Sequence, residues 1–263
     1  MSSSALLGAT TLVYLASSAA WAMYLLFRQR GLHRAAVALC VLGMVAHTGG
    51  MVLRWLESHR MGIGHVPLAN FYESLVVFAW AVAGCCLWMD WHLRTREAPA
   101  FAIPFAFLIL AYASFGTESR IEPLVPALQS NWLLVHVATC FLGYGAFAAS
   151  CGVSLWYLLS KSPSRQLEEL IHKLVMLGFP FLTAGIITGA IWAHFAWGRY
   201  WGWDPKETWS LITWFIYAAF LHARFVRRWR GRRMAVLSLL GFAAVLFTYL
   251  GVNFLLRGLH SYV

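Results

Sequence analysis

Trp197-Gly-Arg-Tyr-Trp-Gly-Trp-Asp-Pro-Lys-Glu-Thr-Trp209, followed by Ser210-Leu-Ile-Thr-Trp214, lies where one long apolar run ends and the next begins. Asp204 predicts the N-cap of a helix, Pro205 its first residue, and Glu207 the reciprocal acceptor of a capping box. Interface belts of membrane proteins use single tryptophans spread around a bundle. The clustered indoles, separated by glycines, predict instead a flat aromatic shelf on a loop, which binds a flat apolar ligand.

The composition is that of an all-α polytopic membrane protein. Of the 263 residues, 60% are hydrophobic and 11% are charged, whereas about a quarter of the residues of a soluble chain are charged. The net charge of +10 does not indicate nucleic-acid binding, because the basic residues lie between the apolar runs. The five cysteines form no Cys-x-x-Cys, which excludes a c-type cytochrome and a dithiol carrier and predicts buried thiols.

The apolar runs predict a bundle of eight transmembrane helices in a single membrane domain, residues 1–263, with the Trp-rich loop 197–214 outside the bilayer. The first run shows no signal-peptide pattern and is expected to be a retained helix. The predicted spans are 5–27, 35–53, 70–91, 100–116, 132–160, 171–196, 208–226 and 234–256.

The basic residues predict the orientation of the bundle. Fourteen of the 20 Lys and Arg residues fall in the loops after the first, third, fifth and seventh spans. The positive-inside rule places these loops in the cytoplasm. Both termini, the Trp-rich loop and the loops 54–69 and 117–131 are then extracytoplasmic.

Three further segments carry local signals. Asn70 and Glu73 predict a second capping box at the start of the third span. Pro123 and Pro126 predict that the loop 117–131 is irregular. The segment 162–175 carries Glu168, Glu169, His172 and Lys173 among Leu and Ile, and we expect an amphipathic cytoplasmic approach to the sixth span.

Two histidines reach the predicted outer face from distant parts of the sequence. His136 lies about five residues into its span, or roughly 7 Å at the rise of a helix, and His260 follows the last span on the same side. Imidazole suits iron, and an iron porphyrin also needs an apolar surface and cations for its propionates. Arg199, Lys206 and the start of the helix at Pro205 are candidates for the propionates.

Two other histidines lie within spans. His222 is about fourteen residues into the seventh span, where a polar side chain is costly and indicates function. Because Arg224 follows, a histidine at the cytoplasmic interface is the alternative. His47 either completes a second iron site with His222 or bonds a neighbouring helix.

At this point four separate motifs resemble those of one family, the CcsA (ResC) branch of the cytochrome c assembly proteins. The Trp-rich stretch resembles the family's WWD signature, and the resemblance covers about residues 45–263. The other motifs are Pro67-Leu-Ala-Asn-Phe-Tyr-Glu-Ser74, Leu128-Gln-Ser-Asn-Trp-Leu-Leu-Val-His136, and Gly251-Val-Asn-Phe with Gly258-Leu-His-Ser-Tyr262.

The resemblance implies a protein that binds heme b in the membrane. It implies delivery of the heme to the extracytoplasmic face for attachment to the Cys-x-x-Cys-His of apocytochrome c, with a CcsB (ResB) partner, as a subunit of a cytochrome c synthase complex. His136 and His260 correspond to the external axial pair and His222 to the buried ligand of an inner heme, whose second ligand comes from the partner. The implied heme platform consists of Trp197, Arg199, Trp201, Trp203, Asp204, Lys206 and Trp209.

No residue is assigned a catalytic role, because the sequence shows no nucleophile–base pair and no nucleotide-binding loop. The membrane is expected to be a bacterial plasma membrane, although a thylakoid membrane would give the same pattern. Two alternatives remain open at this stage. One is a multi-heme b-type electron-transfer subunit, and the other is a scaffold that binds no heme.

Overall fold

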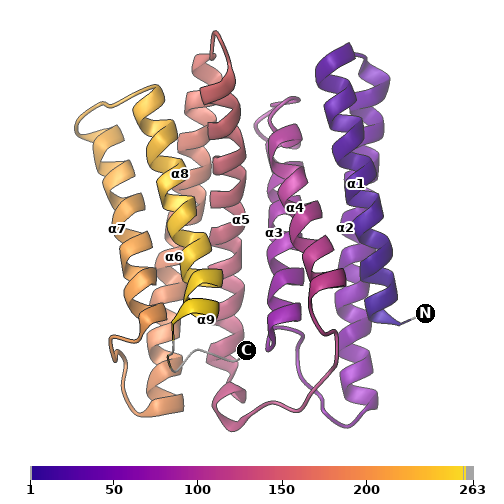
Figure 1. The fold of residues 1–263 in the computed structure, drawn as a ribbon, viewed down its shortest axis with the longest axis vertical. Coiled ribbons are helices and arrows are strands. Elements are labelled where there is room, and N and C mark those ends of the chain that lie inside the picture. Colours follow the sequence, from indigo (N-terminus) through magenta and orange to yellow (C-terminus); the bar gives the residue numbers. More distant parts are fainter. Residues whose placement is uncertain (1, 257, 259–263) are drawn as a thin grey trace. The chain divides into compact units, whose positions relative to one another are not determined.

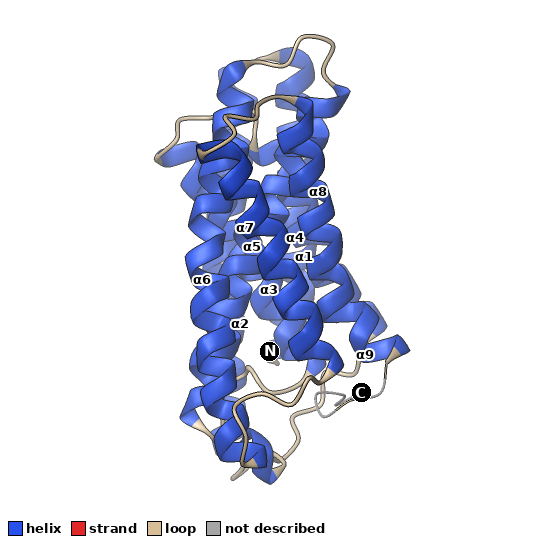
Figure 2. Ribbon diagram, turned by 90° about the vertical axis from the view of Figure 1, so that its left-hand side faces the viewer, coloured by secondary structure: helices blue, strands red, loops and turns tan. Residues whose placement is uncertain are grey.

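The computed structural model describes residues 2–256 and 258, and these residues form helices joined by loops, without a strand (Figure 2). This confirms the prediction of an all-α polytopic membrane protein. The helices are α1 (Ser3–Phe27), α2 (Arg30–Arg60), α3 (Phe71–Trp91), α4 (Pro99–Gly116), α5 (Asn131–Leu159), α6 (Arg165–Trp197), α7 (Pro205–Phe225) and α8 (Arg232–Leu246). A π-helical turn, η2 (Phe247–Gly251), joins α8 to α9 (Val252–Leu255).

Seven helical segments in the described part of the chain are long and apolar enough to cross a membrane. They are α1 to α6 and the continuous segment Arg232–Leu255. α7 is not among them, and it carries Lys206, Glu207 and Arg224. The predicted count of eight spans is therefore approximate.

Two helices extend well beyond their predicted spans. α2 covers 30–60 instead of 35–53, and α6 begins at Arg165 instead of 171. The predicted approach segment 162–175 is thus largely the first turns of α6, which Ser164 caps. Polar contacts hold these extra turns, because Glu57 binds Ser3 of α1 and Glu168 pairs with Arg224 of α7. The loop 117–130 is irregular as predicted, apart from one short turn of 3-10 helix, η1 (Pro126–Leu128).

The chain forms two compact units, Met1–Leu124 and Val125–Val263, called unit 1 and unit 2 below. In unit 1, α1 packs against α2 and α4, and α3 packs against α2 and α4 (Figure 1). In unit 2, α5 packs against α6 and α8, while α7 packs against α6 and α8. The prediction of a single membrane domain stays a prediction.

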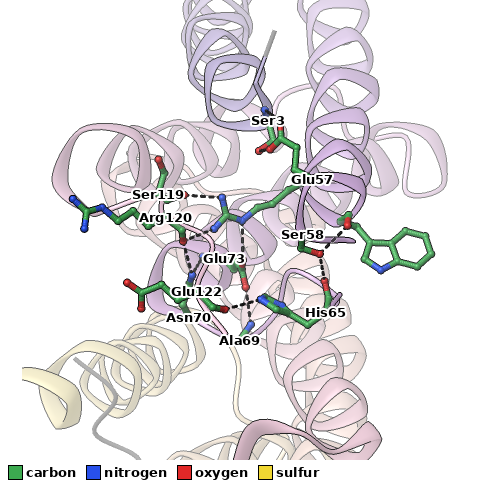
Figure 3. A network of polar contacts seen from close by, with 12 residues as sticks. Ser3, Glu57, Ser58, His65, Ala69, Asn70, Glu73, Ser119, Arg120 and Glu122 are labelled. Atoms are coloured by element: carbon green, nitrogen blue, oxygen red, sulfur yellow. Dashed lines mark hydrogen bonds and ion pairs between the residues drawn. The ribbon is translucent and has the colours of Figure 1, made fainter. Parts of the chain in front are cut away.

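A buried ion pair joins three segments of unit 1. The Arg54 guanidinium in α2 donates from Nε to Glu73 in α3 over 2.7 Å, and the two side chains are only 2% and 1% exposed. Its other nitrogens donate to the carbonyls of Ser119 and Arg120 in the loop after α4. Figure 3 shows Glu73 among the residues of this network. Each of the three guanidinium nitrogens thus reaches an acceptor, and removal of either charged partner would leave the other charge buried without compensation.

The predicted cap of α3 is present, but Glu73 does more than cap. The Asn70 side chain accepts from the Glu73 N–H over 2.8 Å, while Glu73 Oε2 accepts from the N–H of Ala69. The same carboxylate neutralises Arg54, a partner that sequence analysis missed. Nearby, Ser58 donates to the carbonyl of His65, so the loop before α3 is tied back to α2 (Figure 3).

His47 is fully buried in unit 1, and its Nδ1 lies 3.2 Å from the Tyr14 hydroxyl of α1. The structure thus shows the simpler of its two alternatives, a bond to a neighbouring helix. All five cysteines are free thiols, and four of them are buried, which confirms the prediction made for them.

In unit 2, glycines bring α5 and α6 into backbone contact. A Cβ on Gly143 would lie 3.1 Å from the carbonyl oxygen of Gly178, and a Cβ on Gly178 would lie 3.0 Å from that of Gly143. Both distances are shorter than ordinary contacts. Glycine at both positions allows this close approach without displacing either backbone, and the two helices carry much of the candidate site.

Replacing Arg54 with Met leaves the Glu73 carboxylate buried without its cation, and should lower the free energy of unfolding by about 3–5 kcal/mol. Thermal unfolding in detergent measures this. The double variant Arg54→Met/Glu73→Leu should recover much of the loss, because neither charge remains to be desolvated. Arg120→Gln is the control, since its pair with Glu118 is 79% exposed on both sides and should contribute little. Equal unfolding temperatures for Arg54→Met and Arg120→Gln would contradict the assignment.

Candidate functional site

The loop before α7 is held by the predicted capping box, which is present in both halves. Asp204 accepts from the backbone N–H of Lys206 over 3.0 Å. Glu207 Oε2 accepts from the N–H groups of Gly202 and Asp204 over 2.7 and 3.1 Å. One carboxylate therefore fixes the turn that carries Trp203.

The indoles of this loop are not coplanar, so the prediction of a flat shelf is wrong. The rings of Trp201 and Trp203 lie 5.8 Å apart at 89°. Trp203 has a φ of 56°, in the left-handed region, and its side chain is 70% exposed. This backbone conformation turns Trp203 outward, while Trp201 is half-buried. The loop offers one protruding indole with a second at right angles to it.

The remaining platform residue on α7, Trp209, packs inward. Its ring lies 4.1 Å from that of Phe247 in η2. One turn further, Thr213 and Thr248 share a hydrogen bond of 3.1 Å. The first turns of α7 are therefore fixed to the π-helical turn, and Trp209 supports the site from beneath rather than forming a surface.

The two predicted cations differ in their surroundings. Arg199 is exposed, and a Cβ on Gly202 would lie 2.7 Å from its Nε, so its guanidinium covers the turn. Lys206 donates from Nζ to the Asn253 side chain over 2.7 Å. It lies before the predicted span 208–226, and burial lowers its pKa from 10.5 to about 8, against the opposing effect of Asp204. A negative group brought beside Lys206 would favour the charged amine.

His136 in α5 is held by α6. Its Nδ1–H donates to the carbonyl of Gly185 over 2.7 Å, which places the lone pair of the neutral ring on Nε2. The ring is parallel to that of Trp192 within 10°, at 6.1 Å. Trp192 is itself buried and donates to the carbonyl of Ala127. The imidazole therefore has a set tautomer and a set plane.

A glycine makes room for this imidazole. A Cβ on Gly189 would lie 2.6 Å from His136 Nδ1 and 2.7 Å from its Cε1. One turn earlier, a Cβ on Gly185 would lie 2.5 Å from the Cys140 sulfur. The ring of His136 therefore lies directly on the backbone of α6.

Trp192 also connects His136 to the Trp-rich loop, because its ring lies 4.8 Å from that of Trp197. The start of α5, the loop before α7 and the end of α9 lie at one end of unit 2 (Figure 1). Neither Trp192 nor Gly189 was predicted from the sequence, although both precede the Trp-rich stretch by less than three turns of the same helix. Asn253 was not predicted either, although it belongs to the Gly251-Val-Asn-Phe motif.

Gly258, which follows α9, lies near the start of α7. A Cβ on Gly258 would lie 2.5 Å from Asp204 Oδ1 and 3.1 Å from Pro205 Cδ. The glycine thus lies against the N-cap of α7. His260 lies outside the described residues, so its predicted pairing with His136 stays a prediction.

His222 is exposed on α7, three residues before the helix ends. Its predicted role as a ligand of an inner heme, opposite a ligand from the partner, stays a prediction. The buried positions nearby are Phe220 and Ala223, on a different side of α7. The side chain of His222 points away from the interior of unit 2.

The sequence profile described as Cytochrome C assembly protein matches residues 68–260. A protein of Gloeobacter violaceus named cytochrome c biogenesis protein CcsA is 37% identical to this chain. The match covers 98% of this chain and 93% of that protein. The protein of the same name from Porphyra purpurea is 34% identical, and the match covers 92% of this chain and 91% of that protein. A solved structure, the cytochrome c heme lyase CcmF, has a TM-score of 0.74 at 21% identity. It matches 98% of this chain, which spans 48% of that chain, and this likeness shows the shared fold.

Lys206 predicts a pH dependence of stability. Below about pH 8 the amine is charged in both the folded and the unfolded protein, and the full cost of burying the charge is present. Between about 8 and 10.5 the unfolded chain binds more protons, so stability should rise with pH. Thermal unfolding of the wild type and Lys206→Met from pH 7 to 10 checks this, because the variant should lack the rise. Lys161→Met, at an exposed lysine, should retain it, and a rise in Lys206→Met equal to that of the wild type would refute the interpretation.

Proposed function

The chain belongs to the cytochrome c assembly protein family, and from this premise we propose that it binds heme and presents it for covalent attachment to apocytochrome c. The heme, which we infer to be heme b, is cargo held on the extracytoplasmic face. His136, the Trp-rich loop and the C-terminal segment form the presenting site. The acceptor is the Cys-x-x-Cys-His of the apoprotein.

The observation that carries the proposal is the state of His136. An imidazole that ligates a metal usually donates its other N–H to a backbone carbonyl or carboxylate, which orients the ring and fixes the tautomer. His136 makes this bond to Gly185 and lies parallel to Trp192. The lone pair on Nε2 then suits an axial position on iron. The ring would bind without first having to be ordered.

Residues of the Trp-rich loop and of the start of α7 suit the rest of a porphyrin. Trp203 offers an exposed indole for an apolar ring edge. Arg199 and Lys206 supply two cations for the propionates. A propionate beside Lys206 would stabilise the charged form of its buried amine. Trp197, Trp209 and Asp204 support the loop from within. These roles follow the family resemblance, with support and platform now assigned to different tryptophans.

We assign the second axial position to His260. The support is the contact of Gly258, two residues earlier in the chain, with Asp204 and Pro205. That contact places Gly258 beside the loop that carries Trp203. Two axial imidazoles suit holding and protecting heme rather than oxygen chemistry.

We assign uptake of heme to His222, together with a CcsB (ResB) partner. The exposed position of His222 supports this, because a ligand on the outer surface of α7 needs an opposing group from another chain. The excess of basic residues in alternate loops supports an orientation with both termini and the Trp-rich loop outside. A bacterial plasma membrane is the proposed location.

In the attachment reaction the residues of this chain orient rather than react. His136 and His260 hold the iron until the histidine of the acceptor replaces one of them. Trp201 and Trp203 limit where the vinyl edge lies, and Arg199 and Lys206 fix the opposite edge through the propionates. Holding two reactants in position converts an encounter into an intramolecular step, which lowers the barrier by several kcal/mol.

Absorption spectra test the axial pair. His136→Ala and His260→Ala, each purified with the partner, should lose most of the extracytoplasmic heme, and added imidazole should restore it by filling the vacated iron position. His59→Ala changes an exposed histidine in unit 1 and serves as control. Wild-type heme content in both variants without imidazole would remove the assignment.

Gly189→Ala tests the positioning of His136 without removing it. The added methyl would lie 2.6 Å from Nδ1, so the ring must leave the backbone of α6. Loss of such orientation commonly weakens metal binding by about ten- to a hundred-fold, measured here by heme titration. Gly8→Ala is the matched helical control, because nothing lies within 4 Å of its new Cβ. Unchanged heme affinity in Gly189→Ala would show that the packing of the ring is irrelevant.

A further inference from the structure

The turn between α7 and α8 carries a dense positive charge. Residues 226–233 contain five arginines and no acidic residue. We call these five residues the arginine cluster, and each of them is exposed: Arg227, Arg228, Arg230, Arg232 and Arg233. Among the described residues, no carboxylate forms an ion pair with any of the five. The cluster is therefore not neutralised by the described part of the chain.

A sixth arginine shows the contrast. Arg224 is mostly buried, pairs with Glu168 of α6, and donates to the carbonyl of Trp229 over 3.3 Å. Its charge is compensated within unit 2, and its role is to hold the turn. The five arginines of the cluster lie outside this pair.

The turn is folded in a set conformation. The N–H of Trp229 donates to the carbonyl of Ala223 over 3.0 Å. Arg228 and Gly231 adopt left-handed φ values of 54° and 69°, which reverse the chain within a few residues. A Cβ on Gly231 would lie 3.3 Å from the hydroxyl of Tyr157, so the turn packs on the end of α5. The guanidinium groups are consequently presented from a fixed backbone.

Trp229 suits a position at the level of lipid headgroups. Its indole is 39% exposed, and the guanidinium of Arg233 lies 5.4 Å from the ring centroid. Exposed tryptophans beside membrane helices occupy the interface between acyl chains and water. α8 continues directly from the turn as part of an apolar segment long enough to cross the bilayer. We therefore expect the cluster to lie at the depth of the lipid phosphate groups.

We propose that the arginine cluster and Trp229 form a binding site for the phosphate headgroup of an anionic phospholipid. Guanidinium forks match phosphate oxygens in pairs, and they are less strongly hydrated than lysine amines. The positive-inside rule requires only that a cytoplasmic loop be positively charged. It does not account for the folded conformation of this turn or for the packing of Arg233 over the ring of Trp229. The proposal does not depend on the heme function of the opposite end of unit 2.

Lipid binding to the purified protein tests the site. Wild-type protein in detergent is titrated with phosphatidylglycerol, phosphatidylcholine or inorganic phosphate, and bound lipid is counted by native mass spectrometry. Phosphatidylglycerol should bind in preference to phosphatidylcholine. Each arginine near a membrane surface contributes roughly a five-fold factor, so the triple variant Arg227→Gln/Arg228→Gln/Arg230→Gln should bind phosphatidylglycerol about a hundred-fold more weakly.

Two controls separate the site from general charge and from misinsertion. Arg94→Gln/Arg96→Gln removes two exposed arginines of unit 1 and should leave lipid binding unchanged. The triple Lys variant at 227, 228 and 230 keeps the charge that orients the helices, and should bind phosphatidylglycerol more tightly than the triple Gln variant.

Equal binding of phosphatidylglycerol by the wild type and the triple Gln variant would overturn the proposal. Competition by inorganic phosphate at the concentration at which the lipid binds would also overturn it, because it would identify a site for a free anion.

Discussion

The Glu207 carboxylate holds the part of unit 2 on which the proposed site depends. It accepts two backbone N–H groups of the loop 202–204 while α7 begins at Pro205. The same helix start positions Lys206 on Asn253 and brings Asp204 against Gly258. The hydrogen bonds that begin this helix thereby also position the protruding indole of Trp203, the buried amine of Lys206 and the contact of Gly258. Losing them would disturb all three together.

The parts of the fold that depend on local sequence were predictable. Apolar run length indicated the helices, and the order Asp204, Pro205, Glu207 indicated the start of α7, because both signals lie within a few residues of their effect. The partner of Glu73 was not predictable, since Arg54 comes from another helix and only the packing of unit 1 brings the two together. The prediction of a flat aromatic shelf was wrong because of one local feature, the left-handed φ of Trp203, which turns its indole away from that of Trp201.

For the candidate site, the identities of the site residues were easier to predict than the contacts that each residue makes. His136 was identified by its depth in the sequence, but its bond to Gly185 and its stacking on Trp192 required the contact of α5 with α6. His222 was correctly placed late in α7, yet its exposure depends on which side of that helix faces α6 and α8. Periodicity assigns residues to a helix, whereas neighbouring helices decide which of its sides is covered.

The length of α6 has a consequence for how a soluble client could be served. Its 33 residues extend about 50 Å at 1.5 Å per residue, while the hydrocarbon layer is only about 30 Å thick. Even a tilt of about 20° shortens the helix by only a few ångströms along the membrane normal. The excess must stand in the aqueous boundary at one or both ends. If the excess length of α6 projects at its Trp197 end, heme would be transferred at the aqueous boundary. A soluble client would then not need to enter the hydrocarbon layer of the membrane.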